Sequence, residues 1–276
     1  MNRLLAFFVV LLALGGTAAA EAPDRLVIRV VGENWGNVDR QDIEAALYSV
    51  ADALTPASGG RARTVVVAPT SQAPAVLYDH GEGGEYLVQL RARDANWNLY
   101  VYEFAHEYCH IVANYDRRTG SGRNQWFEES LCETASLYAL KTLAETWQAA
   151  PPSKGTAAGS RQLRWFYDLL MAEDHRHLPA AGFGTWLRDN EDELRHDPYR
   201  RRLNEVVAAR LLPLFENRGS WQALASLNLD PSDGDCDFDA YLDHWYGSAP
   251  VAEKAIVAAI RHALRRESAA LVLAPR

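Results

Sequence analysis

Two histidines and an intervening glutamate have the spacing of a catalytic metal site. The pattern His-Glu-x-x-His places His106, Glu107 and His110 within residues 96–113, a segment with strong helical periodicity. Residues four positions apart lie on one face of a helix, so both imidazoles can point at a single ion. Glu107 would lie beside them, where its carboxylate can reach a metal-bound water. Neutral imidazole is a common ligand of zinc, so the pattern predicts a zinc site.

A third ligand is expected because a catalytic zinc has three protein ligands and one open position. Eighteen residues separate His110 from Glu129, which lies in a second predicted helix, residues 125–147. The intervening loop is long enough for the two helices to pack antiparallel, which would bring Glu129 to the histidines. Glu133, one turn later on the same face, is expected to accept the free N–H of a ligand histidine. The alternative is a pair of core histidines on an amphipathic helix.

These residues resemble the motif of the gluzincin metallopeptidases. The run Trp126-x-x-Glu129 is similar to the aminopeptidase N-like branch, where the usual sequence is Trp-Leu-Asn-Glu-Gly and this chain has Trp-Phe-Glu-Glu-Ser. Glu133 matches the position at which the thermolysin-like branch has an aspartate that supports the ligands. The resemblance covers about residues 98–140.

The resemblance implies a zincin-like catalytic domain and a role for each motif residue. It implies one zinc ion bound by His106, His110 and Glu129, with Glu107 as the general base. Glu107 would take a proton from the attacking water and pass it to the leaving amine.

Two further features are expected beside the cleft. The resemblance implies a tyrosine at the start of a later helix as donor to the oxyanion, and Tyr199, seventy residues after Glu129, fits this position. The alternative is that Tyr199 only begins a helix. Strand residues 86–90 are expected either to pair with substrate backbone or to form an ordinary sheet strand. Three aromatic residues that flank the motif are expected to pack in the core: Trp97, Tyr100 and Trp126.

The predicted function is zinc-dependent hydrolysis of peptide bonds in a peptide or protein substrate. Two alternatives stay open. One is an exported zinc-binding structural or binding protein without turnover, and the other is a zinc hydrolase of a non-peptide substrate. The motif does not distinguish an endopeptidase from an aminopeptidase.

The order of the predicted strands and helices indicates an α+β fold. Strands are expected at residues 26–31, 64–68, 75–78 and 86–90, the last two as a hairpin. A first helix is expected at 41–54, capped by Asp39. Beyond a linker at 149–160, helices are expected near residues 161–173, 183–194, 199–216, 237–245 and 252–267. Strands followed by helices favour α+β over alternating α/β architecture.

We expect a single zincin-like domain over residues 21–276. Its strand-rich lobe with the zinc helix would span residues 21–115, and a helical lobe would span residues 116–276. The chain has 28 basic and 36 acidic residues, a net charge of −8, and no basic stripe, so nucleic acid is not an expected partner.

Residues 1–20 have the features of a secretory signal peptide. Arg3 precedes an apolar run, Leu4 to Leu14, and Ala18-Ala19-Ala20 forms a cleavage site. Cleavage would give an exported protein, periplasmic or secreted, with no membrane association. About five residues would then precede the first strand, so we expect no long propeptide and a narrow range of substrates.

Three other features have interpretations that do not involve the zinc site. The cysteines, Cys109, Cys132 and Cys236, are compatible with one disulfide and a free thiol or with three buried thiols. The arginines at 117–118 and 200–202 are expected on the solvated surface. The acidic run 230–239 is expected to cap the following helix, because it lacks the spacing of a calcium-binding loop.

Overall fold

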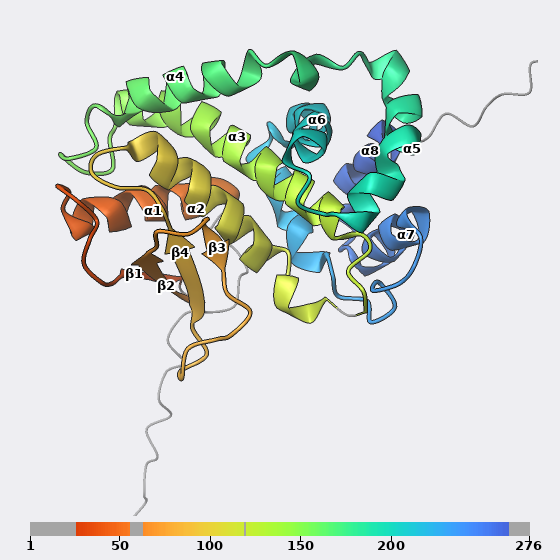
Figure 1. Ribbon diagram of the computed structural model, residues 1–276, viewed down its shortest axis with the longest axis horizontal. Helices are drawn as coiled ribbons and strands as arrows, with labels where there is room; N and C mark the ends of the chain where they lie inside the picture. The colour runs from red at the N-terminus through yellow and green to blue at the C-terminus, as the bar shows by residue number, and fades with distance from the viewer. Residues whose placement is uncertain (1–25, 56–62, 119, 265–276) are drawn as a thin grey trace, which may run out of the picture.

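The computed structural model describes residues 26–55, 63–118 and 120–264 (Figure 1). The predicted signal peptide, residues 1–20, lies outside these ranges. The described chain begins with short strands and continues mainly as helices, so the expected α+β class is confirmed. Among the described helices, none combines the length and the apolar character needed to cross a membrane.

Four short strands form one sheet. In spatial order they are β1 (Val27–Val30), β2 (Thr64–Pro69), β4 (Tyr86–Leu90) and β3 (Ala75–Val76). The first three are parallel, and β3 pairs antiparallel with β4 at the edge. The predicted hairpin is therefore present, although its first strand has only two residues. Parallel neighbours need a crossover connection, which helix α1 (Arg40–Leu54) supplies between β1 and β2.

Eight α-helices make up most of the described chain. After α1 they are α2 (Trp97–Val112), α3 (Gln125–Ala149), α4 (Gly159–Met171), α5 (Ala180–His196), α6 (Arg201–Leu211), α7 (Phe238–Ser248) and α8 (Lys254–Ala263). Short 3-10 helices lie at Tyr115–Arg117, Asp174–His177, Leu212–Phe215 and Arg218–Ser226. The helix predicted at 199–216 is divided, because Pro213 lacks the N–H that would continue α6.

Helix α1 begins where the sequence predicts. The Asp39 side chain accepts a hydrogen bond of 2.9 Å from the backbone N–H of Gln41, which satisfies one free donor of the first turn. One face of α1 is buried against β1, α2 and α3. The buried aliphatic side chains of that face are Ile43, Leu47, Val50 and Leu54.

Helices α2 and α3 pack against each other in opposite directions (Figure 1). Near the start of α2, the Ser136 hydroxyl donates to the backbone carbonyl of Tyr102 at 2.9 Å. Near the end of α2, His110 contacts Glu128, which lies in the first turn of α3. The earlier residue of α2 contacts the later residue of α3, and the reverse. The two helices are therefore antiparallel, as the sequence predicts.

The position of α2 relative to the sheet is fixed by a buried glutamate. Glu103 accepts hydrogen bonds of 2.8 and 3.0 Å from the backbone N–H groups of Arg91 and Ala92, which directly follow β4. Burial raises the pKa of this carboxyl, and the two amide donors oppose that rise. The sheet and the helix that carries the candidate ligands are therefore coupled at one point.

The described elements share one extensive hydrophobic core. The tryptophan and tyrosine residues that flank the motif lie in it, as predicted. Its fully buried tryptophans are Trp97, Trp126, Trp147, Trp221 and Trp245. All three cysteines are free: Cys109 and Cys132 are buried, and Cys236 is partly exposed. The predicted linker at 149–160 connects α3 to α4.

Candidate metal centre

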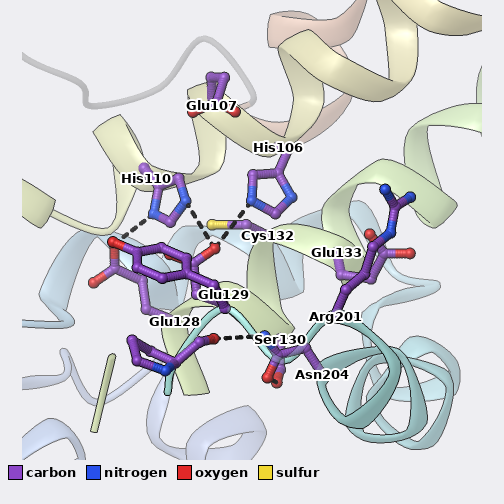
Figure 2. Close-up of polar contacts among 12 residues, drawn as sticks. His106, Glu107, His110, Glu128, Glu129, Ser130, Cys132, Glu133, Arg201 and Asn204 are labelled. Carbon is purple, nitrogen blue, oxygen red and sulfur yellow. Dashed lines mark hydrogen bonds and ion pairs between the residues drawn. The ribbon is translucent and has the colours of Figure 1, made fainter. Parts of the chain in front are cut away.

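The packing of α2 on α3 brings three of the predicted ligands together (Figure 2). Nε2 of His106 lies 3.3 Å from Oε2 of Glu129, and Nε2 of His110 lies 3.6 Å from the same oxygen. One ligand atom from each residue lies within 4.8 Å of the other two. Both histidines therefore direct the same ring nitrogen toward one carboxylate oxygen.

These separations fit a zinc ion. Nitrogen and oxygen ligands about 2.1 Å from a tetrahedral zinc lie about 3.4 Å apart, close to the two separations between histidine and Glu129. Two imidazoles and one carboxylate are also a common ligand set of catalytic zinc. His106 is the most accessible of the three, with 23% of its side chain exposed. The centre is therefore open on one side, as a site with a free coordination position requires.

A carboxylate supports His110, but it is Glu128 and not the predicted Glu133. Oε1 of Glu128 lies 2.6 Å from Nδ1 of His110, and the Glu128 side chain is fully buried. Glu133 has no hydrogen bond to either histidine among the described residues; it instead accepts from the Tyr102 hydroxyl and from Arg176. The expected role of Glu133 is thus corrected, because the crossing of α2 and α3 places it beside Tyr102, one turn before His106.

Neighbouring charges outweigh burial in setting the pKa values of two of the candidate ligands. Burial alone would lower the pKa of His110, but the carboxylates of Glu129 and Glu128 raise it well above its ordinary value of 6.5. Burial alone would raise the pKa of Glu129, yet His110 and His106 hold it far below its ordinary range. The metal-free site therefore favours an ionised Glu129 beside a protonated His110.

Glu107 lies at the cleft and is oriented by the sheet. Its Oε2 accepts a 2.7 Å hydrogen bond from the backbone N–H of Val76 in β3. Among the described residues, no hydrogen bond is formed to its other carboxylate oxygen. The carboxylate thus has a fixed orientation and one oxygen that can receive a proton.

Residues 86–90 form an ordinary internal strand of the sheet, the second of the two alternatives, and the edge strand beside the cleft is β3. Strand β4 pairs with β2 on one side and β3 on the other, so a substrate backbone cannot pair with it. Ala75 and Val76 of β3 instead lie at the sheet edge and line the cleft. The sequence identified this strand but not its neighbours in the sheet.

The candidate ligands lie in a cleft with a volume of about 380 Å³. Its walls come from the β3 region, from α2 and α3, and from the start of α6. Besides the ligands, the lining side chains that can donate or accept hydrogen bonds are Tyr78, Tyr102, Glu103, Glu107, Tyr115, Arg118, Gln125, Glu133, Tyr199, Arg201 and Asn204. A cleft of this size can accept a few side chains of a substrate.

Tyr199 is brought to this cleft although it lies far from the motif in sequence. Its hydroxyl accepts a 2.8 Å hydrogen bond from Nε2 of Gln125, and the same nitrogen lies 3.4 Å from Oε1 of Glu129. Tyr199 is 65% exposed and lies two residues before the start of α6. Gln125 is a neighbour of the site that sequence reasoning missed.

Arg118 was expected at the surface, and that expectation is wrong. Only 13% of its side chain is exposed, and Nη1 lies 3.4 Å from Oε2 of Glu128. The guanidinium also donates to the Tyr78 hydroxyl. The physical reason is that the fully buried Glu128 carboxylate needs a counter-charge, which no local sequence pattern reveals.

A second buried arginine, Arg176, pairs with two glutamates close to Tyr102 of the cleft. The Arg176 side chain is fully buried, with Nη2 lying 3.1 Å from Oε1 of Glu133 and 3.0 Å from Oε1 of Glu205. Burial and the charge of Glu133 raise the pKa of Tyr102, so its hydroxyl remains a donor. Arg201 also reaches this hydroxyl, at 3.0 Å, although 65% of its side chain is exposed. Sequence reasoning did not predict this network.

Comparison with known proteins identifies no relative: no family model, curated protein or solved structure matches this chain. A function therefore has to be inferred from the chemistry of the site itself.

Proposed function

We propose that this protein is a zinc-dependent hydrolase that cleaves peptide bonds and that its catalytic domain is zincin-like. One observation carries the proposal. His106 and His110 point Nε2 at the same oxygen of Glu129, on the wall of a cleft that also contains Glu107. The sequence resemblance to gluzincins supports the same assignment.

The residues that would hold zinc are His106, His110 and Glu129. When bound there, zinc would lower the pKa of a water and polarise a substrate carbonyl. Glu107 would receive a proton from the attacking water on its other oxygen, and the hydrogen bond from the Val76 N–H to Oε2 supports this role because it orients the carboxylate. Glu107 would then donate that proton to the leaving amine. The Tyr199 hydroxyl, which is linked to Glu129 through Gln125, would donate to the developing oxyanion.

The shape of the cleft supports a peptide substrate. The edge strand β3 lines the cleft, and an extended peptide can add to an exposed edge through backbone hydrogen bonds. The outward N–H of Val76 is taken by Glu107 in the substrate-free protein, so only a short stretch of the edge can pair. A short edge and a small cleft favour selective cleavage over general protein digestion.

The main alternative is a protein that binds zinc without turnover. Structural zinc sites are usually closed by four protein ligands. Here the described cluster contains three, and His106 is partly exposed to the cleft. A structural site needs no general base, whereas Glu107 lies in the cleft with one carboxylate oxygen that forms no hydrogen bond among the described residues. These features favour catalysis, and hydrolysis of a non-peptide substrate would use the same residues.

The test is a digest of a mixed peptide library with mass-spectrometric readout. The zinc-loaded protein should cleave a defined subset of peptides, chelation should abolish cleavage, and added zinc should restore it. Casein should be degraded slowly or not at all. Bound zinc without cleavage of any library peptide would contradict the peptidase proposal. A parallel panel of esters and non-peptide amides would then identify a different hydrolase.

A further inference from the structure

A second group of metal-binding side chains lies away from the cleft. Asp233 and Cys236 precede α7, and His244 lies within it. Nδ1 of His244 lies 2.9 Å from Oδ1 of Asp233, and Sγ of Cys236 lies 3.4 Å from the backbone oxygen of Asp233. One ligand atom from each of the three side chains lies within 4.8 Å of the other two.

The acidic run that contains this group uses its aspartates in different ways. Asp237 caps α7 by accepting a 2.8 Å hydrogen bond from Ala240, which confirms the capping predicted from the sequence. Asp235 accepts from the backbone and hydroxyl of Ser121. Asp233 is the buried aspartate of the run, with 7% of its side chain exposed, and it faces the thiol and the imidazole. Capping therefore does not explain Asp233.

The positive charge available to the Asp233 carboxylate is limited. Its ion-pair partner among the described residues is His244, which is charged only when its imidazole is protonated. Arg195 is also nearby, but its Nη2 donates to the backbone oxygen of Cys236 and its Nη1 pairs with Glu191 at 3.5 Å. A divalent cation would supply the positive charge that a neutral His244 lacks.

A buried oxygen beside the group is also unsatisfied. Nδ2 of Asn124 donates to the backbone oxygen of Cys236 at 3.1 Å and lies 3.8 Å from its sulfur. The Asn124 side chain is buried, and its Oδ1 has no hydrogen-bond donor among the described residues. Buried polar atoms normally have a partner, so this oxygen can accept a hydrogen bond from water bound beside the group.

We propose that Asp233, Cys236 and His244 form a second metal site, which binds zinc and holds the acidic loop against α7. Thiolate and imidazole favour zinc over calcium or magnesium, which prefer oxygen ligands. Sulfur and nitrogen or oxygen ligands of a tetrahedral zinc lie about 3.6 Å apart, so the Cys236 sulfur would move by up to roughly 1 Å toward the other two ligand atoms, while Asp233 and His244 would separate slightly. Cys236 lies in a loop and is partly exposed, which permits that movement.

The consequence of this site is structural. Asn124 directly precedes α3, and its side chain is tied to the loop through Cys236. Asp235 ties the same loop to Ser121 in the α2–α3 connection. An ion that fixes the loop would therefore fix the beginning of α3, the helix that carries Glu128 and Glu129.

The first test is the zinc content of the reconstituted full chain. The wild-type protein should bind two zinc ions, and Cys236→Ser and His244→Ala should each bind one. His262→Ala, which removes an exposed histidine of α8, is the matched control and should bind two. His110→Ala should also bind one zinc ion, because it removes a ligand of the first centre and leaves the second intact.

Reconstitution with cobalt(II) provides a readout that does not depend on activity. A thiolate ligand gives a charge-transfer band in the near ultraviolet, and the His106 centre has no sulfur ligand in the cluster described. The band should be present in the wild type and in His110→Ala, and absent in Cys236→Ser. One zinc per wild-type chain, or a band that persists in Cys236→Ser, would overturn the second site. If only the hydrolase proposal is wrong, the thiolate band and its loss in Cys236→Ser will remain.

Discussion

Glu128 and His110 are joined by a 2.6 Å contact between Oε1 and Nδ1, so the residue next to one candidate ligand orients another. The other oxygen of Glu128 accepts a 2.7 Å hydrogen bond from Asn228 and lies 3.4 Å from Arg118. The carboxylate is thus held by three groups in a fully buried position. It can keep the His110 proton on Nδ1 and leave the Nε2 lone pair directed at the metal.

Glu128→Ala should weaken zinc binding by about 10–100-fold, the usual effect of removing a carboxylate that supports a ligand histidine. The variant leaves Arg118 without its buried partner, so circular dichroism should accompany zinc titration. Glu145→Ala is the control, because Glu145 lies on the same helix and is exposed. Equal zinc affinity in Glu128→Ala and wild type would show that this contact does not support the centre.

Tyr199→Phe should lower kcat by about a hundredfold, the scale observed for loss of one oxyanion donor, while zinc content stays unchanged. Tyr78→Phe is the matched control, because Tyr78 is also an exposed tyrosine of the cleft. Steady-state kinetics on one cleaved library peptide would make the comparison. A large loss in Tyr78→Phe with little change in Tyr199→Phe would assign the donor to Tyr78 instead.

Arg176→Ala should destabilise the protein by about 3–5 kcal/mol, because Glu133 and Glu205 would lose their shared buried counter-charge. Urea denaturation of the zinc-free protein measures this directly. Arg164→Ala breaks an exposed pair with Glu145 and should change stability by less than about 1 kcal/mol. A similar small change in both variants would mean that the Arg176 network adds little.

The ligand helices could be predicted from the sequence because their signals are local. The spacing of His106 and His110 reflects one helical face, and Glu129 lies on the next helix along the chain. The carboxylate that supports His110 could not be predicted in this way, because Glu128 and Glu133 both lie on α3 near Glu129. The choice depends on how α3 is rotated and shifted against α2, which only the tertiary packing determines.

Strand order in the sheet also could not be predicted from local sequence. The residues of β3 and β4 could be identified from their composition and the glycine-rich turn between them. Their neighbours could not, because strand order depends on the crossover through α1 that places β2 beside β4. Arg118 and Arg176 were also beyond prediction, since a buried arginine differs from a solvated one only in the distant acids that it meets.

Zinc binding should strengthen as the pH rises and should release a proton. Burial alone would lower the pKa of His110, but Glu129 and Glu128 raise it well above 6.5, and zinc needs the neutral imidazole. In the zinc-free protein, protonated His110 stabilises the fold fully below about pH 6.5, and this contribution is lost as the pH rises through its folded-state pKa. Calorimetry in buffers of different ionisation enthalpy counts the protons. Zinc affinity that is constant from about pH 5 to 8 would contradict this assignment.

The most direct test of the central claim is one preparation of Glu107→Gln assayed for both metal and hydrolysis. Glutamine has nearly the same shape but cannot take the proton, and Glu107 is not one of the clustered ligands. Zinc bound at His106, His110 and Glu129 should be unchanged in this variant, and peptide cleavage should fall at least about a hundredfold. Cleavage at the wild-type rate by the zinc-loaded variant would show that Glu107 is not the general base.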